Sequence, residues 1–88
     1  MKNRSRTEII TTILKASRVG TTKTRIMYVA FLSYSQLTSY LKLLSENKMI
    51  SYDEGSQLYR TTEKGLKFLD MADEISDMFT KPEGLKMK

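Results

Sequence analysis

Apolar residues recur at helical spacing close to the start of the chain. Residues 5–18 are predicted to form a first helix, whose inward face carries Ile9, Ile10, Ile13 and Leu14. Ser5 and Glu8 match the capping box that opens many helices. Gly20 favours a left-handed stop, because glycine has no Cβ to oppose a positive φ. The pattern therefore indicates a short amphipathic helix with both ends marked.

Two further amphipathic helices are predicted at residues 22–30 and 33–47, joined by a tight turn. The inward stripe of the first is Ile26, Val29 and Ala30. Ser33 and Gln36 form a second capping box, which fixes the start of the other helix. The buried face of that helix is expected to carry Leu37, Tyr40, Leu41 and Leu44. A helix pair of this kind is the arrangement that places one helix in the major groove of DNA.

After Lys48 the pattern changes from helical to alternating. Residues 49–53 and 57–61 are predicted to be two short strands, and Gly55 lies in the turn between them. Residues 49–61 should therefore form a β-hairpin.

A last and longer helix is predicted at residues 62–80, about 27 Å long at 1.5 Å per residue. Its side toward the core should carry Leu66, Leu69 and Ala72. A second apolar stripe on the same helix consists of Phe68, Met71, Ile75 and Met78. A helix of this length extends beyond the small domain, so the apolar side chains at its far end need another surface to pack against. Residues 81–88 are expected to be a flexible tail.

Composition limits the chain to one domain and argues against an enzyme. With 88 residues, the domain is expected to span residues 1–80 and to be thinly stable, which favours association with a partner. The chain has no Cys and no His, so thiolate and imidazole metal ligands, disulfides and the usual general base are missing. We therefore expect no enzymatic activity, no cofactor, no metal and no small-molecule ligand.

The N-terminal apolar stretch does not resemble a targeting or membrane segment. It is interrupted by Thr11, Thr12 and Lys15, so neither a signal peptide nor a membrane span is predicted. The expected location is the cytoplasm, in association with the nucleoid.

The net charge of +5 is distributed unevenly. Residues 1–25 carry seven Lys and Arg against Glu8 alone, whereas residues 66–80 carry four acidic residues against Lys67. The basic end is suited to a polyanion, with the acidic helix facing away from it. An alternative interpretation is that both are solvated faces that maintain solubility.

The outward face of the third predicted helix carries hydrogen-bonding side chains. Hydroxyl, amide and ammonium groups are the groups that read base edges in the major groove. The predicted base contacts are Tyr34, Ser35, Gln36, Thr38, Ser39 and Lys42. The predicted phosphate contacts are Arg4, Arg6, Lys23, Arg25, Gln57 and Arg60. Lys23 and Arg25 lie in the first turn of a helix, where the dipole disfavours cations unless a phosphate is near.

Two segments of the sequence resemble the winged helix-turn-helix family, in particular its small archaeal regulators and chromatin proteins. They are TKTRIMYVAFLSYSQLTSYLKLLSENKMIS and LYRTTEKGLKFLD, and the resemblance covers roughly residues 7–70. It implies an α+β fold of three helices, a two-stranded wing and a longer C-terminal helix. It also implies a recognition helix at residues 33–47, binding of double-stranded DNA and a homodimer built by the last helix. The expected dimer interface is Phe68, Met71, Ile75, Met78 and Phe79.

The chain departs from the family pattern at two places. Relatives commonly carry a polar residue such as Asn before LSYSQ, where this chain has Phe31. A positive φ is unfavourable for Phe, so either the turn differs or the ring is buried or held by a partner. The wing tip carries Asp53 and Glu54, which repel phosphates.

A rival hypothesis is a protein–protein adaptor. Winged helices can use the same apolar core as rigid adaptors in nucleic-acid complexes, with no base readout. Phe31, the acidic last helix and the few cations on the third helix, Lys42 and Lys48, agree with that hypothesis.

Overall fold

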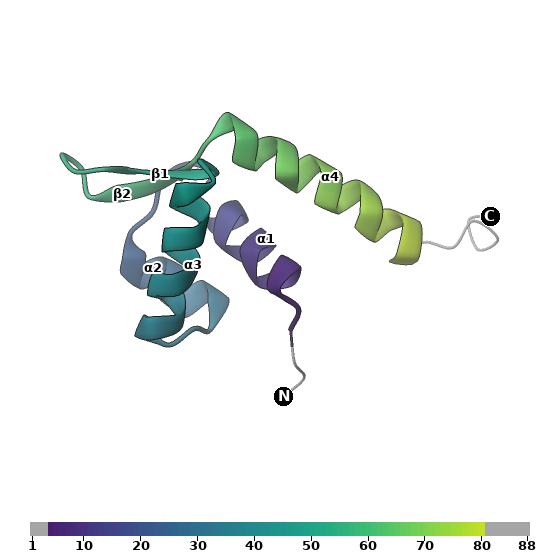
Figure 1. Cartoon of the computed structure of the whole chain (residues 1–88), viewed down its shortest axis with the longest axis horizontal. Helices are drawn as coiled ribbons and strands as arrows, with labels where there is room; N and C mark the ends of the chain where they lie inside the picture. The colour runs from purple at the N-terminus through teal and green to yellow at the C-terminus, as the bar shows by residue number, and fades with distance from the viewer. Residues whose placement is uncertain (1–3, 81–88) are drawn as a thin grey trace.

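The computed structural model describes residues 4–80, which form four helices and one two-stranded antiparallel sheet (Figure 1). The elements are α1 (Arg6–Ala16), α2 (Lys23–Ala30), α3 (Tyr34–Glu46), β1 (Ile50–Asp53), β2 (Leu58–Thr61) and α4 (Glu63–Thr80). This is the order that the sequence predicted, so the α+β fold class is confirmed. The predicted tail, residues 81–88, lies outside the described residues.

Helix α1 begins as predicted and ends earlier than predicted. The Ser5 hydroxyl accepts the Glu8 N–H at 3.1 Å, and the Glu8 carboxylate accepts the Ser5 N–H at 3.0 Å, so the capping box is present. The helix ends at Ala16 instead of residue 18, with Ser17 as its C-cap. Gly20 has a φ of 99°, but it lies in the following turn and does not end the helix.

The turn between α2 and α3 has a left-handed residue at its centre. Thr22 caps α2, and the residue after α2, Phe31, has φ 54° and ψ 50°. The second capping box is also present, because the Ser33 hydroxyl accepts the Gln36 N–H at 3.2 Å and the Gln36 oxygen accepts the Ser33 N–H at 2.9 Å. The turn is left-handed and Phe31 is exposed, so neither an altered turn nor burial of the ring holds. The remaining possibility, that a partner holds the ring, stays a prediction.

One core unites all four helices and the start of the hairpin. It consists of Ile13, Leu14, Ile26, Ala30, Leu32, Leu37, Leu41, Leu44, Ile50 and Leu69. Tyr40 is partly buried against this core, and so are Ile9 and Ile10 of α1. The inward face of α3 and that of α1 therefore agree with the sequence pattern.

Two predicted inward positions are wrong. Val29 is 41% exposed, because the buried side of α2 is centred between Ile26 and Ala30, and Met27 packs there in its place. On α4, Leu66 is 38% exposed, whereas Phe68 packs against the core. Leu66 and Phe68 lie on opposite sides of the direction of buried Leu69, and the core is on the side of Phe68, so Leu66 faces solvent.

The hairpin is joined to the end of α1 by buried hydroxyl groups and backbone bonds. In the sheet, Ile50 pairs with Thr61 and Asp53 with Leu58. The Thr61 hydroxyl donates to the Leu14 carbonyl at 2.6 Å, and the Thr61 N–H donates to the Ser17 carbonyl at 2.9 Å. Thr61 and Ser17 are both buried, so these bonds are shielded from water.

A short bridge extends the sheet on the side of β2. Thr21 and Tyr59 exchange two backbone hydrogen bonds of 2.9 and 2.7 Å. The connection between α1 and α2 therefore runs along the hairpin as a one-residue third strand. The wing and the helical part are consequently held as one body.

Helix α4 starts against the hairpin and extends away from it along α1 (Figure 1). The Thr62 hydroxyl donates to the Lys48 carbonyl at 2.7 Å and accepts the Gly65 N–H at 3.1 Å, which caps the start of the helix. Beyond that start, α4 exposes Met71, Ile75 and Met78. Among residues 4–80, no helix has the length and apolar character needed to cross a membrane.

Candidate nucleic-acid interface

The outward face of α3 presents a row of polar side chains. All six predicted base-contact residues are exposed: Tyr34, Ser35, Gln36, Thr38, Ser39 and Lys42. The opposite side of the helix carries Leu37, Leu41 and Leu44 in the core, which fixes the rotation of the helix. The face is therefore open to a ligand in the described structure.

The hydrogen bonds within α3 restrict what two of these side chains can do. The Gln36 side-chain oxygen is occupied by the Ser33 N–H, so a two-atom contact with adenine would break the capping box. The Thr38 hydroxyl donates to the Tyr34 carbonyl at 2.9 Å. Among residues 4–80, Ser35, Ser39 and Lys42 form no side-chain hydrogen bond, so they are the groups most available to base edges.

Lys23 connects α3 to the wing. Its ammonium lies 5.1 Å from the centre of the Tyr34 ring and 3.4 Å from the Tyr34 hydroxyl. It lines a shallow hollow of about 230 Å³ together with Thr38, Leu41, Lys42, Ser45 and Tyr59. A second hollow, of about 580 Å³, lies between the start of α2 and the wing and is lined by Thr22, Lys23, Thr24, Tyr52, Ser56, Gln57 and Tyr59. The fold thus brings Lys23, Lys42 and Gln57 to one continuous surface.

Gln57 reaches this surface from the turn and not from a strand. It has a φ of 61° and donates its N–H to the Asp53 carbonyl at 2.6 Å. Its predicted position on the second strand is therefore wrong, because β2 begins at Leu58. Tyr59 and Tyr52, which the sequence analysis did not select, form the floor beside it, with ring centres 4.6 Å apart. The sequence signal that could have identified them is a tyrosine in each of the two short, otherwise largely polar strands.

The arginines among the predicted phosphate contacts are dispersed. Arg4 donates to the Ala30 carbonyl at 2.6 Å and to the Phe31 carbonyl at 3.4 Å, so it caps the C-terminal end of α2. Arg60 lies on the face of β2 opposite to Tyr59, over the backbone of Gly20. Arg6 and Arg25 are exposed, at the start of α1 and on the outer side of α2. Arg4 and Arg60 are thus not brought together with Lys23.

The wing tip carries fixed negative charge. The Asp53 carboxylate accepts the Ser56 N–H at 3.0 Å and the Ser56 hydroxyl at 2.6 Å. These hydrogen bonds lower the pKa of Asp53 below its usual 3.8, so the group is ionised at neutral pH. Glu54 beside it is exposed. Electrostatics therefore disfavour contact between this tip and phosphate groups.

The chain matches a family model described as winged helix-turn-helix over residues 3–80. It belongs to the winged helix-turn-helix family. Within that fold, α2 and α3 are the helix-turn-helix pair and β1–β2 is the wing. No curated protein sequence matches the chain.

A solved structure agrees with this winged-helix assignment. The chain is similar to Sso10a-2, described as a DNA-binding protein from Sulfolobus solfataricus, with a TM-score of 0.73 and 26% sequence identity. The similarity covers 85% of this chain and 81% of that one. It therefore includes most of both molecules.

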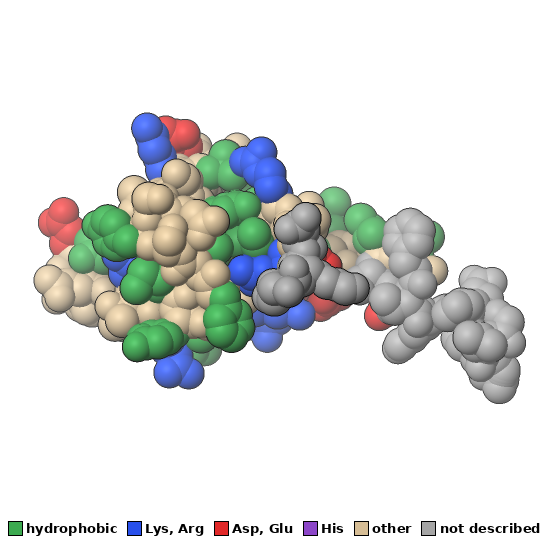
Figure 2. Space-filling view, turned by 90° about the horizontal axis from the view of Figure 1, so that it is seen from below, with side chains coloured by type: hydrophobic (Ala, Val, Ile, Leu, Met, Phe, Trp, Pro, Cys, Tyr) green, Lys and Arg blue, Asp and Glu red, His purple; other side chains and the backbone are tan. Residues whose placement is uncertain are grey.

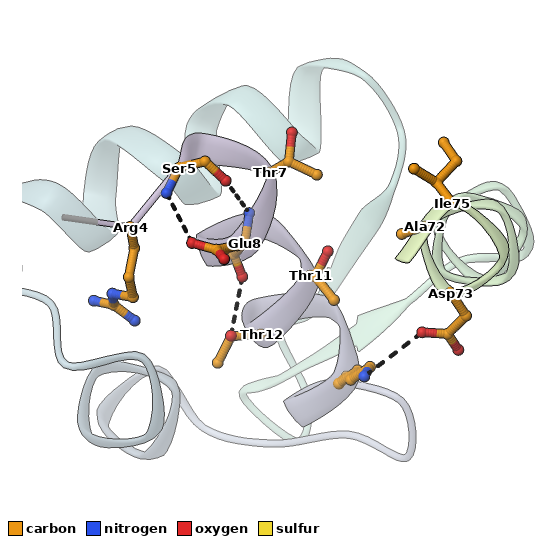
Figure 3. Close-up of a pocket in the computed structure, with 10 residues that line it drawn as sticks. Arg4, Ser5, Thr7, Glu8, Thr11, Thr12, Ala72, Asp73 and Ile75 are labelled. Atoms are coloured by element: carbon orange, nitrogen blue, oxygen red, sulfur yellow. Dashed lines mark hydrogen bonds and ion pairs between the residues drawn. The ribbon is translucent and has the colours of Figure 1, made fainter. Parts of the chain in front are cut away.

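A further hollow of the winged helix lies away from α3, between α1 and α4 (Figure 3). It measures about 720 Å³ and is crossed by an ion pair of 3.8 Å between Lys15 and Asp73. Glu8, which also lines it, is held in the capping box, and Arg4 points away toward α2. In the described residues, no three acidic side chains lie close enough to hold a metal ion.

The predicted dimer residues occupy different environments on α4. Met71, Ile75 and Met78 are exposed and share one side of the helix. Phe68 is partly buried against the protein's own core, so only part of its ring is available to a partner, and its place in a dimer interface stays a prediction. The side chain of Phe79 lies outside the described part of the structure.

Proposed function

We propose that this winged helix binds double-stranded DNA, with α3 in the major groove. The observation that carries the proposal is the exposed row of hydroxyls on α3 beside Lys23 and Lys42. Between Glu8 and Glu46 the chain contains no Asp or Glu, so nothing on α2 or α3 opposes a polyanion before the last turn of α3. The similarity to a DNA-binding protein, Sso10a-2, supports the same function.

In the proposed complex the side chains divide into two roles. Ser35 and Ser39 contact base edges, Lys42 contacts a base edge and the adjacent phosphate, and Gln36 contributes only its amide N–H groups. Lys23 and Arg25, at the N-terminal end of α2, neutralise phosphates, where the helix dipole adds to their charge. A phosphate there also accounts for two cations in a helical first turn. The function is binding, as a transcriptional regulator or a chromatin protein, without catalysis.

The test is a salt titration of duplex binding with Lys42→Ala. Each phosphate-neutralising cation contributes about 0.9 to the slope of log K against log salt, so the slope should fall by about one unit with lower affinity. Lys67→Ala is the matched control. Lys67 is exposed on α4, so this variant removes the same charge from a helix distant from α3. Equal slopes for Lys42→Ala and the unmodified protein would exclude a phosphate contact at this residue.

We further propose that the protein acts as a homodimer through the exposed stripe Met71, Ile75 and Met78 of α4. Three large apolar side chains on one helix face are costly to leave in water. In a dimer, two α3 helices about 34 Å apart would meet successive major-groove faces of one duplex.

The second candidate function is a protein–protein adaptor. The observation in its favour is the exposed pair Tyr28 and Phe31 together with the acidic wing tip. A titration with random duplex at low salt separates the two functions. A DNA-binding module should bind with a Kd near 1 μM, whereas an adaptor should bind no better than about 1 mM.

A further inference from the structure

Three aromatic side chains are exposed at the helix-turn-helix: one on α2, one in the turn after it and one at the start of α3. Tyr28 is 76% exposed, Phe31 79% and Tyr34 61%. They follow Arg25 at intervals of three residues, so this set, Arg25, Tyr28, Phe31 and Tyr34, is here called the aromatic ridge. Tyr28 and Phe31 have no place in the proposed duplex contacts, so the ridge needs a different explanation.

The turn that holds Phe31 outward is fixed on both sides. The Phe31 N–H donates to the Tyr28 carbonyl at 3.3 Å, and the Leu32 N–H donates to the Met27 carbonyl at 3.1 Å. Leu32 is buried directly after the turn. Phe31 is therefore presented to solvent by a defined backbone, at the cost of a left-handed conformation that is unfavourable for its side chain.

Cations accompany the rings. Lys23 lies over the Tyr34 ring, and Arg4 is bonded to the backbone carbonyl of Phe31 itself. Figure 2 views the molecule from the α2–α3 end and shows hydrophobic side chains standing among Lys and Arg side chains. The surface is thus both aromatic and positively charged.

We propose that the aromatic ridge binds an unpaired nucleic-acid strand, with bases stacked on Tyr28, Phe31 and Tyr34 and phosphates near Lys23 and Arg25. Aromatic rings with flanking cations are the combination by which single strands are bound without sequence preference. In a paired duplex the base faces are covered by their neighbours, so exposed rings gain little from it. The proposal does not depend on α3 entering a major groove.

The experiment titrates a fluorescent twelve-nucleotide oligothymidine at low salt and follows anisotropy and quenching of tyrosine fluorescence. Micromolar binding with quenching is expected. Tyr28→Ser and Phe31→Asn should each weaken binding about tenfold with the salt slope unchanged, because stacking releases no counterions. Arg25→Ala should lower the slope by about 0.7, the contribution of one phosphate contact to a single strand. Val19→Ser is the control, because Val19 is an equally exposed apolar residue outside the ridge.

Two results would overturn the proposal. One is an affinity for oligothymidine that is at least about 100-fold lower than the affinity for the random duplex. The other is binding that both ring variants leave unchanged, which would mean charge attraction alone. Duplex binding is measured on the same variants. Binding of oligothymidine is also measured with Lys42→Ala, which lies outside the ridge and should leave it unchanged. Loss of duplex binding alone would therefore count against the proposed function and not against the ridge.

Discussion

At the scale of single residues, Phe31 is the least expected feature of this protein. The sequence indicated that a left-handed turn would be unfavourable at this position, and the turn is left-handed all the same. The cost of such a conformation is about 1 to 2 kcal/mol for a residue with a Cβ. Asn tolerates it better, because its short polar side chain can bond locally.

Phe31→Asn should therefore raise the free energy of unfolding by about 0.5 to 1 kcal/mol. Urea denaturation followed by circular dichroism would measure the change. Phe31→Ala is the control, since it removes the ring and retains the Cβ that causes the strain, and it should give no such gain. An equal gain for both variants would mean that ring exposure, and not backbone conformation, destabilises the protein.

Some contacts of single residues could be predicted from the local sequence alone, and others could not. Both capping boxes were predicted correctly, because each depends on two side chains three positions apart. The role of Arg4 was not predictable, because its carbonyl partner Ala30 is 26 positions away. The position of Arg60 over the backbone of Gly20 was not predictable for the same reason, because these two residues are also far apart in sequence.

At the scale of elements, the order of helices and strands followed from periodicity, but two helix faces did not. A stripe of apolar residues defines a face only to within about a quarter turn. Val29 and Leu66 lie at the margins of their stripes, and the position of the neighbouring helix left both exposed. Phe68 was assigned outward for the same reason and is held by the core.

The packing of the start of α4 against the hairpin can be tested by a substitution at Gly65. A Cβ at Gly65 would lie 2.6 Å from Cγ2 of Thr61 and against the carbonyl of Met49. Gly65→Ala should therefore lower the free energy of unfolding by about 1 to 3 kcal/mol, although alanine favours helices. Thermal denaturation would measure this.

The matched control for Gly65→Ala is Gly55→Ala at the wing tip. The nearest atoms to a Cβ there belong to the Asp53 carboxylate, at 3.8 Å. This variant should be close to neutral. If Gly65→Ala were equally neutral, the start of α4 would not be packed against Thr61 and Met49 as described.

At the scale of the whole molecule, apolar surface and charge are separated along its length. The helix-turn-helix end is cationic and carries the polar face of α3, whereas the far part of α4 carries Asp70, Asp73, Glu74 and Asp77 beside its apolar stripe. A polyanion is therefore directed to one end and leaves the stripe on α4 available for a second copy.

Ile75→Asp should convert the proposed dimer into a monomer, because it places a charge in the centre of the apolar stripe. Light scattering coupled to gel filtration would then give 10.2 kDa, the mass of one chain. Lys64→Asp, which adds a carboxylate on α4 outside the stripe, should remain a dimer. A dimeric mass for Ile75→Asp would place the interface elsewhere.

The buried bonds from Thr61 to Leu14 and Ser17 have a consequence for how a duplex could be accommodated. They prevent the wing from swinging toward or away from α3 to suit grooves of different width. Any adjustment on docking would have to come from the duplex, as bending or a change of groove width, and base steps differ in how easily they deform. Sequences with pliable pyrimidine–purine steps would then be preferred even where no side chain touches a base.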